Sequence, residues 1–304
     1  MEHFKKSIFA LLALAVATLS GCSADGDEGQ DFCSYPEDNV VRLTACVGSG
    51  WTTDLQPRAA YTSDNITEFG ISINNQKDYR YCYGNYKVTK SGTTWTSSTR
   101  MLWQKADQEV DIYAYAPYNG NYTGNIYQET KFAGSVSADQ TADTDHSDFL
   151  SCKLYGFKPG QDLVNGCVPI ELQHMLSQLN VTLKLGTSLN SGAALTKNPV
   201  TEVTVGGTIP GYTFNFATQA VTCSTGSAVT IKAPQTSFTA AASKTDYARA
   251  VYSCIVVPQT VAVGKLAIEV TLSVGDEVKC YTYTNGKAIT LESGKSHALQ
   301  LTIK

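Results

Sequence analysis

The sequence has 304 residues, of which 42% are hydrophobic and 16% are charged, and its formal net charge is -4 at pH 7. This low charge, with no basic run after the first residues, argues against a nucleic-acid partner. The hydrophobic content is rich in Val, Thr and Tyr, which is typical of a folded β-rich protein and not of a disordered chain.

The first 22 residues have the layout of a secretory signal. Lys5 and Lys6 give a positive start, residues 8–19 are apolar, and small residues precede Cys22. The apolar run is too short for a membrane-spanning helix, which needs about 20 residues. Its ending, Leu19-Ser20-Gly21-Cys22, resembles a bacterial lipobox, which implies cleavage before Cys22 and lipidation of the Cys22 thiol. An ordinary signal with a chance cysteine is the alternative.

Cleavage before Cys22 removes the signal peptide, residues 1–21, and leaves 283 of the 304 residues, a length suited to two domains. The next stretch, residues 22–32, is an acidic leader that we expect to be flexible. It looks like the export tag of surface lipoproteins of the Bacteroides group. We therefore expect a lipoprotein anchored by lipid in the outer membrane and displayed at the cell surface.

Cysteine usage leaves two interpretations open. Eight cysteines remain besides Cys22, an even number that permits disulfides in an exported chain, but the sequence does not determine their pairing. Buried free thiols are the alternative. The wide spacings, without a C-x-x-C motif, argue against a zinc site. Cys152 and Cys167 bracket a loop and are the first candidates for a bridge, which would contribute about 3 kcal/mol.

Short strand patterns separated by turn residues follow one another through the first half of the chain. The first covers residues 40–47, and a looser segment ending in Gln56-Pro57-Arg58-Ala59-Ala60 follows it. Alternation of apolar and polar residues is clearest over residues 109–116, and Pro117 stops it. No helical period is sustained. The first half is therefore predicted to be an all-β sandwich or barrel.

Residues 79–83 are predicted to form a strand that places Tyr79, Tyr81 and Tyr83 on one face. Buried against another sheet, the three rings would be cross-strand packing. Exposed, they would form an aromatic platform for sugars or partner proteins, and the three tyrosines are therefore a candidate ligand face.

The second half begins with residues 170–185, in which the phase of alternation shifts once near Ser177. A single strand with a β-bulge accounts for this shift, and a short helix is the alternative. Later strand patterns cover residues 252–257, 265–274, 278–283 and 299–303, and Gly275-Asp276 predicts a hairpin between the second and third. We expect an all-β protein with one domain over residues 33–163 and another over residues 164–304.

The chain offers little catalytic chemistry. After the signal it has three histidines, His146, His174 and His297, and it has no G-x-S-x-G, phosphate-binding loop or H-E-x-x-H motif. His174 alternates with leucines and is interpreted as a core histidine with a backbone partner. The acidic residues between 139 and 148 lack the ligand spacing of a calcium loop. We predict no catalytic residue, no metal site, no cofactor and no enzymatic activity.

Several motifs, in order along nearly the whole chain, resemble the fimbrillin-like (Mfa-like, FimA-type) surface lipoproteins of the Bacteroides group. They are the lipobox at Cys22, Pro57-Arg58-Ala59, Gly92-Thr93-Thr94-Trp95, Leu102-Trp103, and residues 110–117, 171–181 and 294–303. The resemblance implies two tandem transthyretin-like β-sandwiches and a role as a structural subunit of cell-surface fimbriae, with a part in adhesion.

The resemblance also implies a mechanism of assembly. An arginine-directed protease removes the first strand, and a strand of a neighbouring subunit fills the groove that it leaves. In this sequence the implied cut lies between Arg58 and Ala59. The removable strand is residues 40–47 and the donor is residues 298–304. The residues expected to take part in strand exchange are Val40, Val41, Leu43, Ala45, Leu299, Leu301 and Ile303.

The implied partners are other fimbrial subunits, the membrane through the lipid anchor, and a host or bacterial surface receptor. The many cysteines depart from the family pattern, because a bridge from Cys33 or Cys46 to the body would hold the cut leader in place. A different interpretation is a surface lipoprotein that does not polymerise and binds a glycan or host ligand.

Overall fold

The computed structural model describes residues 35–48, 61–122, 131–142 and 147–304. These residues belong to one compact unit, Cys33–Lys304. Their secondary structure is almost entirely β-strand, with one four-residue helix, α1 (Pro159–Asp162), and short 3-10 turns. The prediction of an all-β protein is confirmed. No helix in these ranges is both long and apolar enough to cross a bilayer.

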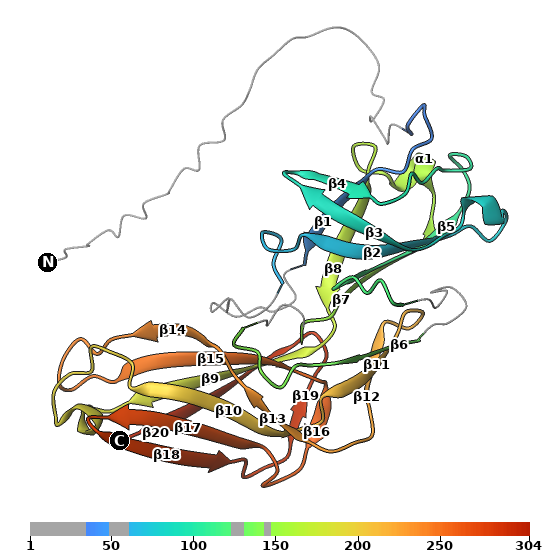
Figure 1. The fold of residues 1–304 in the computed structure, drawn as a ribbon. Coiled ribbons are helices and arrows are strands. Elements are labelled where there is room, and N and C mark those ends of the chain that lie inside the picture. The colour runs from blue at the N-terminus through green and yellow to red at the C-terminus, as the bar shows by residue number, and fades with distance from the viewer. Residues whose placement is uncertain (1–34, 49–60, 123–130, 143–146) are drawn as a thin grey trace, which may run out of the picture. The chain divides into compact units, whose positions relative to one another are not determined.

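Seven strands close into a barrel in the order β1-β4-β3-β2-β5-β7-β8, coloured from blue to green in Figure 1. Their bounds are β1 (Leu43–Val47), β2 (Glu68–Asn74), β3 (Tyr83–Ser91), β4 (Thr94–Ser97), β5 (Val110–Ala116), β7 (Leu150–Phe157) and β8 (Val168–His174). Alternate residues of these strands point inward, and Phe69, Ile71, Ile112 and Ile170 are buried in one apolar core. A barrel is one of the two architectures predicted for the first half.

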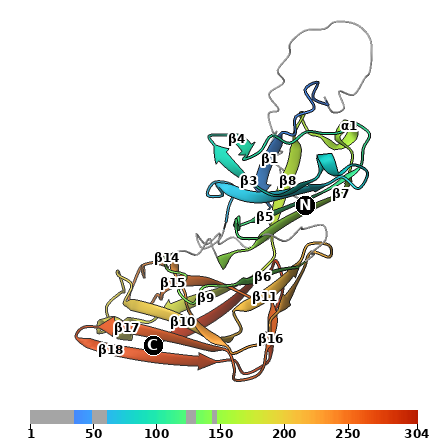
Figure 2. The same cartoon turned by 45° about the vertical axis from the view of Figure 1, so that its right-hand side comes forward.

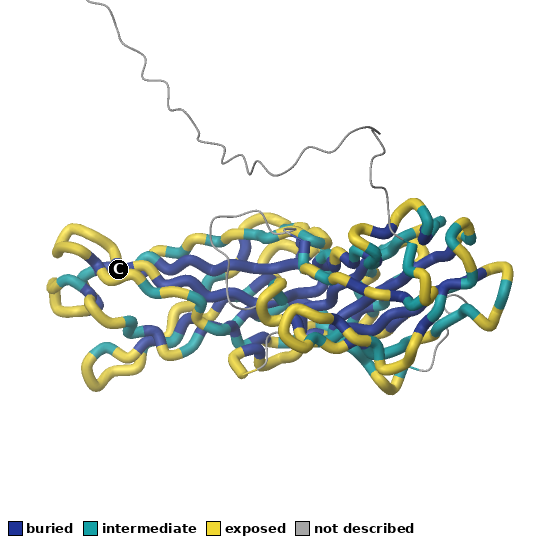
Figure 3. Tube along the Cα trace, turned by 90° about the horizontal axis from the view of Figure 1, so that it is seen from above, coloured by how far each residue is buried: buried dark blue, intermediate teal, exposed yellow. Residues whose placement is uncertain are grey.

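The remaining strands form two four-stranded sheets, β13-β10-β17-β18 and β14-β15-β9-β20, a three-stranded sheet β12-β11-β6 and the pair β16-β19. Their bounds are β6 (Lys131–Ser135), β9 (Ser177–Leu185), β10 (Val200–Thr208), β11 (Gly211–Asn215), β12 (Ala220–Cys223), β13 (Val229–Lys232), β14 (Gln235–Thr239), β15 (Ala248–Val256), β16 (Gln259–Val261), β17 (Ala267–Val274), β18 (Glu277–Thr284), β19 (Ile289–Leu291) and β20 (Ser296–Ile303). The two four-stranded sheets share a second core, which includes Val181, Leu183, Ile268 and Val270. Figure 3 shows buried residues following the strands and exposed residues concentrated in the connecting loops.

The prediction of one bulged strand over residues 170–185 is wrong, and so is the helical alternative. β8 ends at His174, and β9 begins at Ser177 in a different sheet. Ile170 and Leu172 are buried in the barrel core, whereas Leu179 and Val181 are buried in the second core. The phase of the apolar residues changes at the point where the chain leaves one sheet for another.

Strand pairing also crosses the domain boundary expected between residues 163 and 164. β8 closes the barrel by pairing with β1 and β7. In the other direction, β6 pairs along its whole length with β11. The compact unit Cys33–Lys304 is not divided at residue 163, and the division into domains there stays a prediction.

The predicted bridge between Cys152 and Cys167 is wrong, because both thiols are free. Cys152 is buried in β7 on the side of the barrel core, whereas Cys167 belongs to a tight turn closed by two backbone hydrogen bonds with Val164. Seven cysteines in the described ranges are free: Cys46, Cys82, Cys152, Cys167, Cys223, Cys254 and Cys280. Of these, Cys152 and Cys254 are buried. Cys22 and Cys33 lie outside the described residues.

Candidate functional site

β1 is held mainly along one of its two edges. It runs parallel to β8 through five residue pairs, from Leu43 opposite Val168 to Val47 opposite Leu172. On its other edge it pairs with β4 at Leu43 and Trp95 alone. Figures 1 and 2 both show β1 and β8 side by side. Because a short strand is bound by its ladder, most of the backbone bonding of β1 depends on β8.

The predicted strand over residues 40–47 is present in a shorter form. Val40 makes an isolated bridge with Leu102, and Val41 donates its N–H to the carbonyl of Met101 at 3.0 Å. Val41 and Leu43 are buried, and Ala45 packs against the same barrel core. The apolar residues expected to take part in strand exchange therefore anchor β1 from one side.

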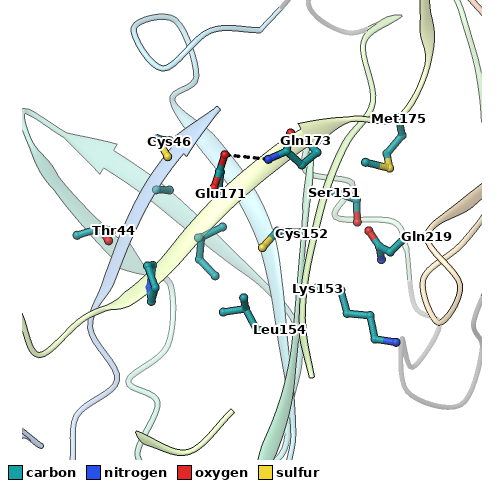
Figure 4. A pocket seen from close by; sticks show the side chains of 13 residues that line it. Thr44, Cys46, Ser151, Cys152, Lys153, Leu154, Glu171, Gln173, Met175 and Gln219 are labelled. Atoms are coloured by element: carbon teal, nitrogen blue, oxygen red, sulfur yellow. Dashed lines mark hydrogen bonds between the residues drawn. The ribbon is translucent and has the colours of Figure 1, made fainter. Parts of the chain in front are cut away.

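A groove of about 650 Å³ lies beside β1. It forms because β7 and β8 pair at only two positions, Leu150 with His174 and Ser151 with Gln173. Figure 4 shows β8 diverging from β7 beyond that end, with Cys152 and Leu154 of β7 in the opening. The groove is lined by residues of β1, β7 and β8 together with Met175 and Gln219.

The thiols in this groove are not activated nucleophiles. Burial raises the pKa of Cys152 to about 11, although a hydrogen bond with the backbone of Glu171 opposes the shift. Partial burial also raises the pKa of Cys46, and the nearby Glu171 carboxylate adds to the effect. Both thiols are therefore protonated at neutral pH. Glu171 itself accepts a hydrogen bond from Gln173 Nε2 at 2.9 Å.

A buried pair of hydrogen-bonded side chains lies near the point where β7 and β8 meet. Asp148 Oδ2 lies 2.9 Å from His174 Nδ1, and the side chains are 0% and 7% exposed. The same oxygen accepts the backbone N–H of Tyr61 at 3.0 Å. His174 is buried, as predicted, and its hydrogen-bond partner is the carboxylate of Asp148, one of the acidic residues between 139 and 148 considered above for calcium binding. No local spacing connects Asp148 with His174, so no signal in the sequence indicated this pair.

β20 lies at the edge of its sheet and runs parallel to β9 through eight residue pairs, from Ser296 to Ile303. Leu299 and Leu301 are half-buried against the second core, and Ile303 is buried in it. The alternation predicted over residues 299–303 is confirmed. In the described part of the chain, the second edge of β20 has no strand partner.

The three tyrosines do not share a strand face, and that prediction is wrong. Residues Tyr79–Tyr81 form a 3-10 turn that begins at Asp78, whose side chain accepts the N–H of Arg80. Tyr79 is 80% exposed, whereas Tyr83 belongs to β3 and its hydroxyl accepts the N–H of Leu102 at 2.8 Å. The capping aspartate, together with the turn residues before it, overrides the alternating pattern.

Some predicted site residues lie outside the described residues. Cys22, Arg58 and Ala59 are among them, so the predicted lipidation and cleavage sites stay predictions. Within the described ranges, no group of three or more His, Cys, Asp or Glu side chains is arranged to hold a metal ion. The arrangement of β1, the groove and β20 thus offers sheet edges and apolar side chains, which suit binding of another polypeptide.

The sequence matches the family described as fimbrillin-like over residues 57–304. The chain belongs to the fimbrillin-like family. The recognition made from the motifs is therefore confirmed. The matched region begins next to Arg58 and contains every strand of the structure after β1. No protein with a curated description matches the chain.

Solved structures of similar fold include proteins from Bacteroides species. A candidate cell adhesion protein from Bacteroides uniformis has 19% sequence identity and a TM-score of 0.60, over 88% of this chain and 94% of that one. One from Bacteroides ovatus has 18% identity and a TM-score of 0.60, over 88% and 92%. A fimbrial protein from Bacteroides vulgatus has 14% identity and a TM-score of 0.53, over 87% and 95%. At these identities the likeness concerns the fold alone.

Proposed function

We propose that this chain is a structural subunit of cell-surface fimbriae and that neighbouring subunits join by strand addition after β1 is removed. Membership of the fimbrillin-like family supports the role as a fimbrial subunit and the location at the cell surface. Under this proposal the chain binds other fimbrial subunits, contributes to adhesion and catalyses no reaction. We also propose that the chain has the organisation expected from the family, with two transthyretin-like domains in tandem.

The observation that carries the mechanism is the way β1 is held. A ladder of five pairs along β8 and one pair with β4 bind it to the barrel. Arg58 lies in the connection between β1 and Tyr61, so a single cut there separates β1 from the rest of the barrel. Loss of β1 leaves the edge of β8 unpaired beside an existing groove. An unpaired edge accepts a new strand through main-chain hydrogen bonds.

Two further parts of the proposal concern the N-terminus. Lipidation of Cys22, with the acidic leader acting as an export signal, would deliver the uncut chain to the outer membrane surface. A cut after Arg58 would then separate the subunit from the lipidated leader and from β1, which lie on the other side of the cut. The N-terminal residue of the protein recovered from cells tests both parts: lipidated Cys22 identifies an anchored chain, and Ala59 identifies a processed subunit.

Assembly of the purified chain tests the mechanism. The mature chain is treated with an arginine-specific protease, and its oligomeric state is followed by size-exclusion chromatography and electron microscopy. We expect oligomers from the cut chain, and none from an Arg58→Ala variant or from a cut chain that lacks residues 298–304. A cut chain that stays monomeric, or an Arg58→Ala chain that assembles equally well, contradicts the proposal.

A further inference from the structure

β18 is the outermost strand of the sheet β13-β10-β17-β18, and one of its two edges is open. On the other edge it pairs with β17 without a register shift, from Ala267 opposite Thr284 to Val274 opposite Glu277. No strand in the described part of the chain pairs with the open edge. Figures 1 and 2 both show β18 at the margin of its sheet. A straight, unpaired edge of this kind is a template for another strand.

Exposed apolar side chains distinguish β18 from the other strands. Val278 is 76% exposed and Tyr281 is 36% exposed, and no other strand in the described ranges has two large apolar side chains among the exposed ones. β18 also lacks the proline, glycine or bulge that protects many edge strands. It has one lysine, Lys279, whose Nζ lies 3.5 Å from the carboxylate of Glu277 in the same strand. The open edge is therefore apolar and has little protection against pairing.

The hairpin at Gly275-Asp276 shows which residues of β18 address the open edge. A two-residue hairpin closes on a hydrogen-bonded pair, which here is Val274 and Glu277. Hydrogen-bonded and non-hydrogen-bonded pairs alternate along an antiparallel ladder, so every second residue after Glu277 bonds to β17. The residues between them turn their backbone N–H and C=O groups toward the open edge, and they are Val278, Cys280, Thr282 and Thr284.

The charges and the length of β18 favour a second copy of β18 as its partner. Glu277 and Lys279 lie in the first half of the strand, whereas residues 280–284 are neutral. Antiparallel pairing of two copies brings each charged half against the neutral half of the other. Parallel pairing would instead bring the two Lys279 ammonium groups together. The edge strands β12, β13 and β14 have four, four and five residues, so they match β18 over little more than half of its eight residues.

We propose that two copies of this chain form a side-by-side dimer in which their β18 strands pair antiparallel about a two-fold axis at Cys280. In this register the outward backbone groups of Val278 meet those of Thr282 of the second copy. The interface uses neither β1 nor β20. It goes beyond the proposed function, because it is open in the uncut chain and does not depend on strand addition.

The side chain of Lys279 favours this register over its neighbours. With the axis at Cys280, Lys279 lies opposite Tyr281 of the second copy, whose exposed ring can interact with the ammonium group. With the axis at Lys279, the two lysines would lie opposite each other. With the axis at Tyr281, Lys279 would lie opposite Tyr283, whose ring packs against the core of its own subunit.

Sedimentation equilibrium of the mature chain carrying Arg58→Ala tests the dimer, because this variant keeps β1 in place. We expect a concentration-dependent equilibrium between monomer and dimer, with no larger species. Thr282→Pro should weaken the dimer at least ten-fold, because it removes an N–H on the open edge and leaves the ladder with β17 intact. Val278→Lys should weaken it at least ten-fold as well. Val164→Lys is the matched control, because Val164 is 54% exposed in a turn of the barrel.

The thiol of Cys280 reports the register. Residues opposite each other in a hydrogen-bonded pair have Cα atoms about 5.5 Å apart, which is within reach of a disulfide. Oxidised glutathione takes two electrons and two protons from the two Cys280 thiols and becomes two thiols. We expect a covalent dimer on a non-reducing gel from the Arg58→Ala chain and from its Cys46→Ser variant, and none from Cys280→Ser. Cys46 is the matched control, because its thiol is also free and exposed.

Four results would overturn this inference. They are a chain that stays monomeric, a dimer that Thr282→Pro and Val278→Lys leave unchanged, a dimer whose Cys280 thiols do not cross-link, and oligomers that grow beyond the dimer. Each of them leaves assembly after the cut at Arg58 untouched, because that assembly uses β1 and β20. Conversely, a cut chain that never assembles would contradict the proposed function without affecting a dimer at β18.

Discussion

The first and last strands, β1 and β20, both run parallel to a neighbouring strand, but they occupy different positions in their sheets. β1 lies inside a closed barrel, with β8 on one edge and β4 on the other. β20 lies at the edge of an open sheet and is paired with β9 alone. Removal of β1 therefore opens the barrel, whereas departure of β20 only narrows a sheet. A chain that gives up its first strand and lends its last strand would use these positions.

The partners of the two terminal strands follow one another in the sequence. β8, the partner of β1, ends at His174, and β9, the partner of β20, begins at Ser177. The crossing between them is fixed by the Asp148–His174 pair and by a hydrogen bond from Met175 N–H to the Phe149 carbonyl at 2.9 Å. A substitution at this crossing should therefore affect the partners of both terminal strands, whereas a substitution in β1 or β20 should affect one strand alone.

The largest effect is expected from Asp148→Ala. Removing the carboxylate takes away the hydrogen-bond partner of the buried His174 ring nitrogen, and each buried polar group that loses its partner in this way costs about 1–3 kcal/mol. The Tyr61 N–H would lose its acceptor as well. Urea unfolding of the mature chain measures the loss, and Asp148→Asn should lose less because its amide oxygen can still accept. A loss below about 1 kcal/mol would mean that the pair does not support the crossing.

The next largest effects distinguish the contribution of β1 to stability from that of β20. Leu43→Ala and Ile303→Ala each remove a buried side chain, and each should lower the free energy of unfolding of the uncut chain by about 2–5 kcal/mol. After a cut at Arg58 and loss of β1, the Leu43→Ala chain should match the cut wild-type chain, whereas Ile303→Ala should still be less stable. If Leu43→Ala keeps its effect after the cut, β1 has not left the barrel.

A smaller effect concerns access to two buried thiols. Burial raises the pKa of Cys152 to about 11 and that of Cys254 to about 12. Loss of β1 should expose Cys152 to water, lower its pKa toward the ordinary value and speed its reaction with a maleimide at pH 8 at least ten-fold. Cys254, in β15, should react no faster than before. Mass spectrometry of tryptic peptides measures both rates, and equal acceleration would indicate general loosening of the fold.

The smallest effect is expected at Tyr79. Its side chain is 80% exposed, and we expect Tyr79→Ala to change the free energy of unfolding by less than about 0.5 kcal/mol. Assembly of the cut chain should proceed at the wild-type rate, because Tyr79 belongs to neither terminal strand nor the groove. Slower assembly would show that the turn at residues 79–81 contacts a neighbouring subunit.

Strands that carry a clear local alternation were predictable from the sequence. Residues 110–116, 267–274 and 299–303 are strands, and the hairpin at Gly275-Asp276 pairs Val274 with Glu277. The same reasoning failed at residues 79–83, where a capped turn replaces the strand. It also failed at residues 170–185, where a change of sheet looks in the sequence like a bulge within one strand.

The sequence by itself determined the all-β class, most strand positions and, through its motifs, the fimbrillin-like family. Only the tertiary structure decided that β1 closes a barrel beside β8, that β7 and β8 part to form a groove, and that Asp148 meets His174. The physical reason is that alternation is a property of neighbouring residues, whereas ladder partners and buried hydrogen-bonded side chains join segments that lie far apart in the chain. Asp148 and His174 are 26 residues apart and Leu43 and Val168 are 125 apart, so no local pattern records these contacts.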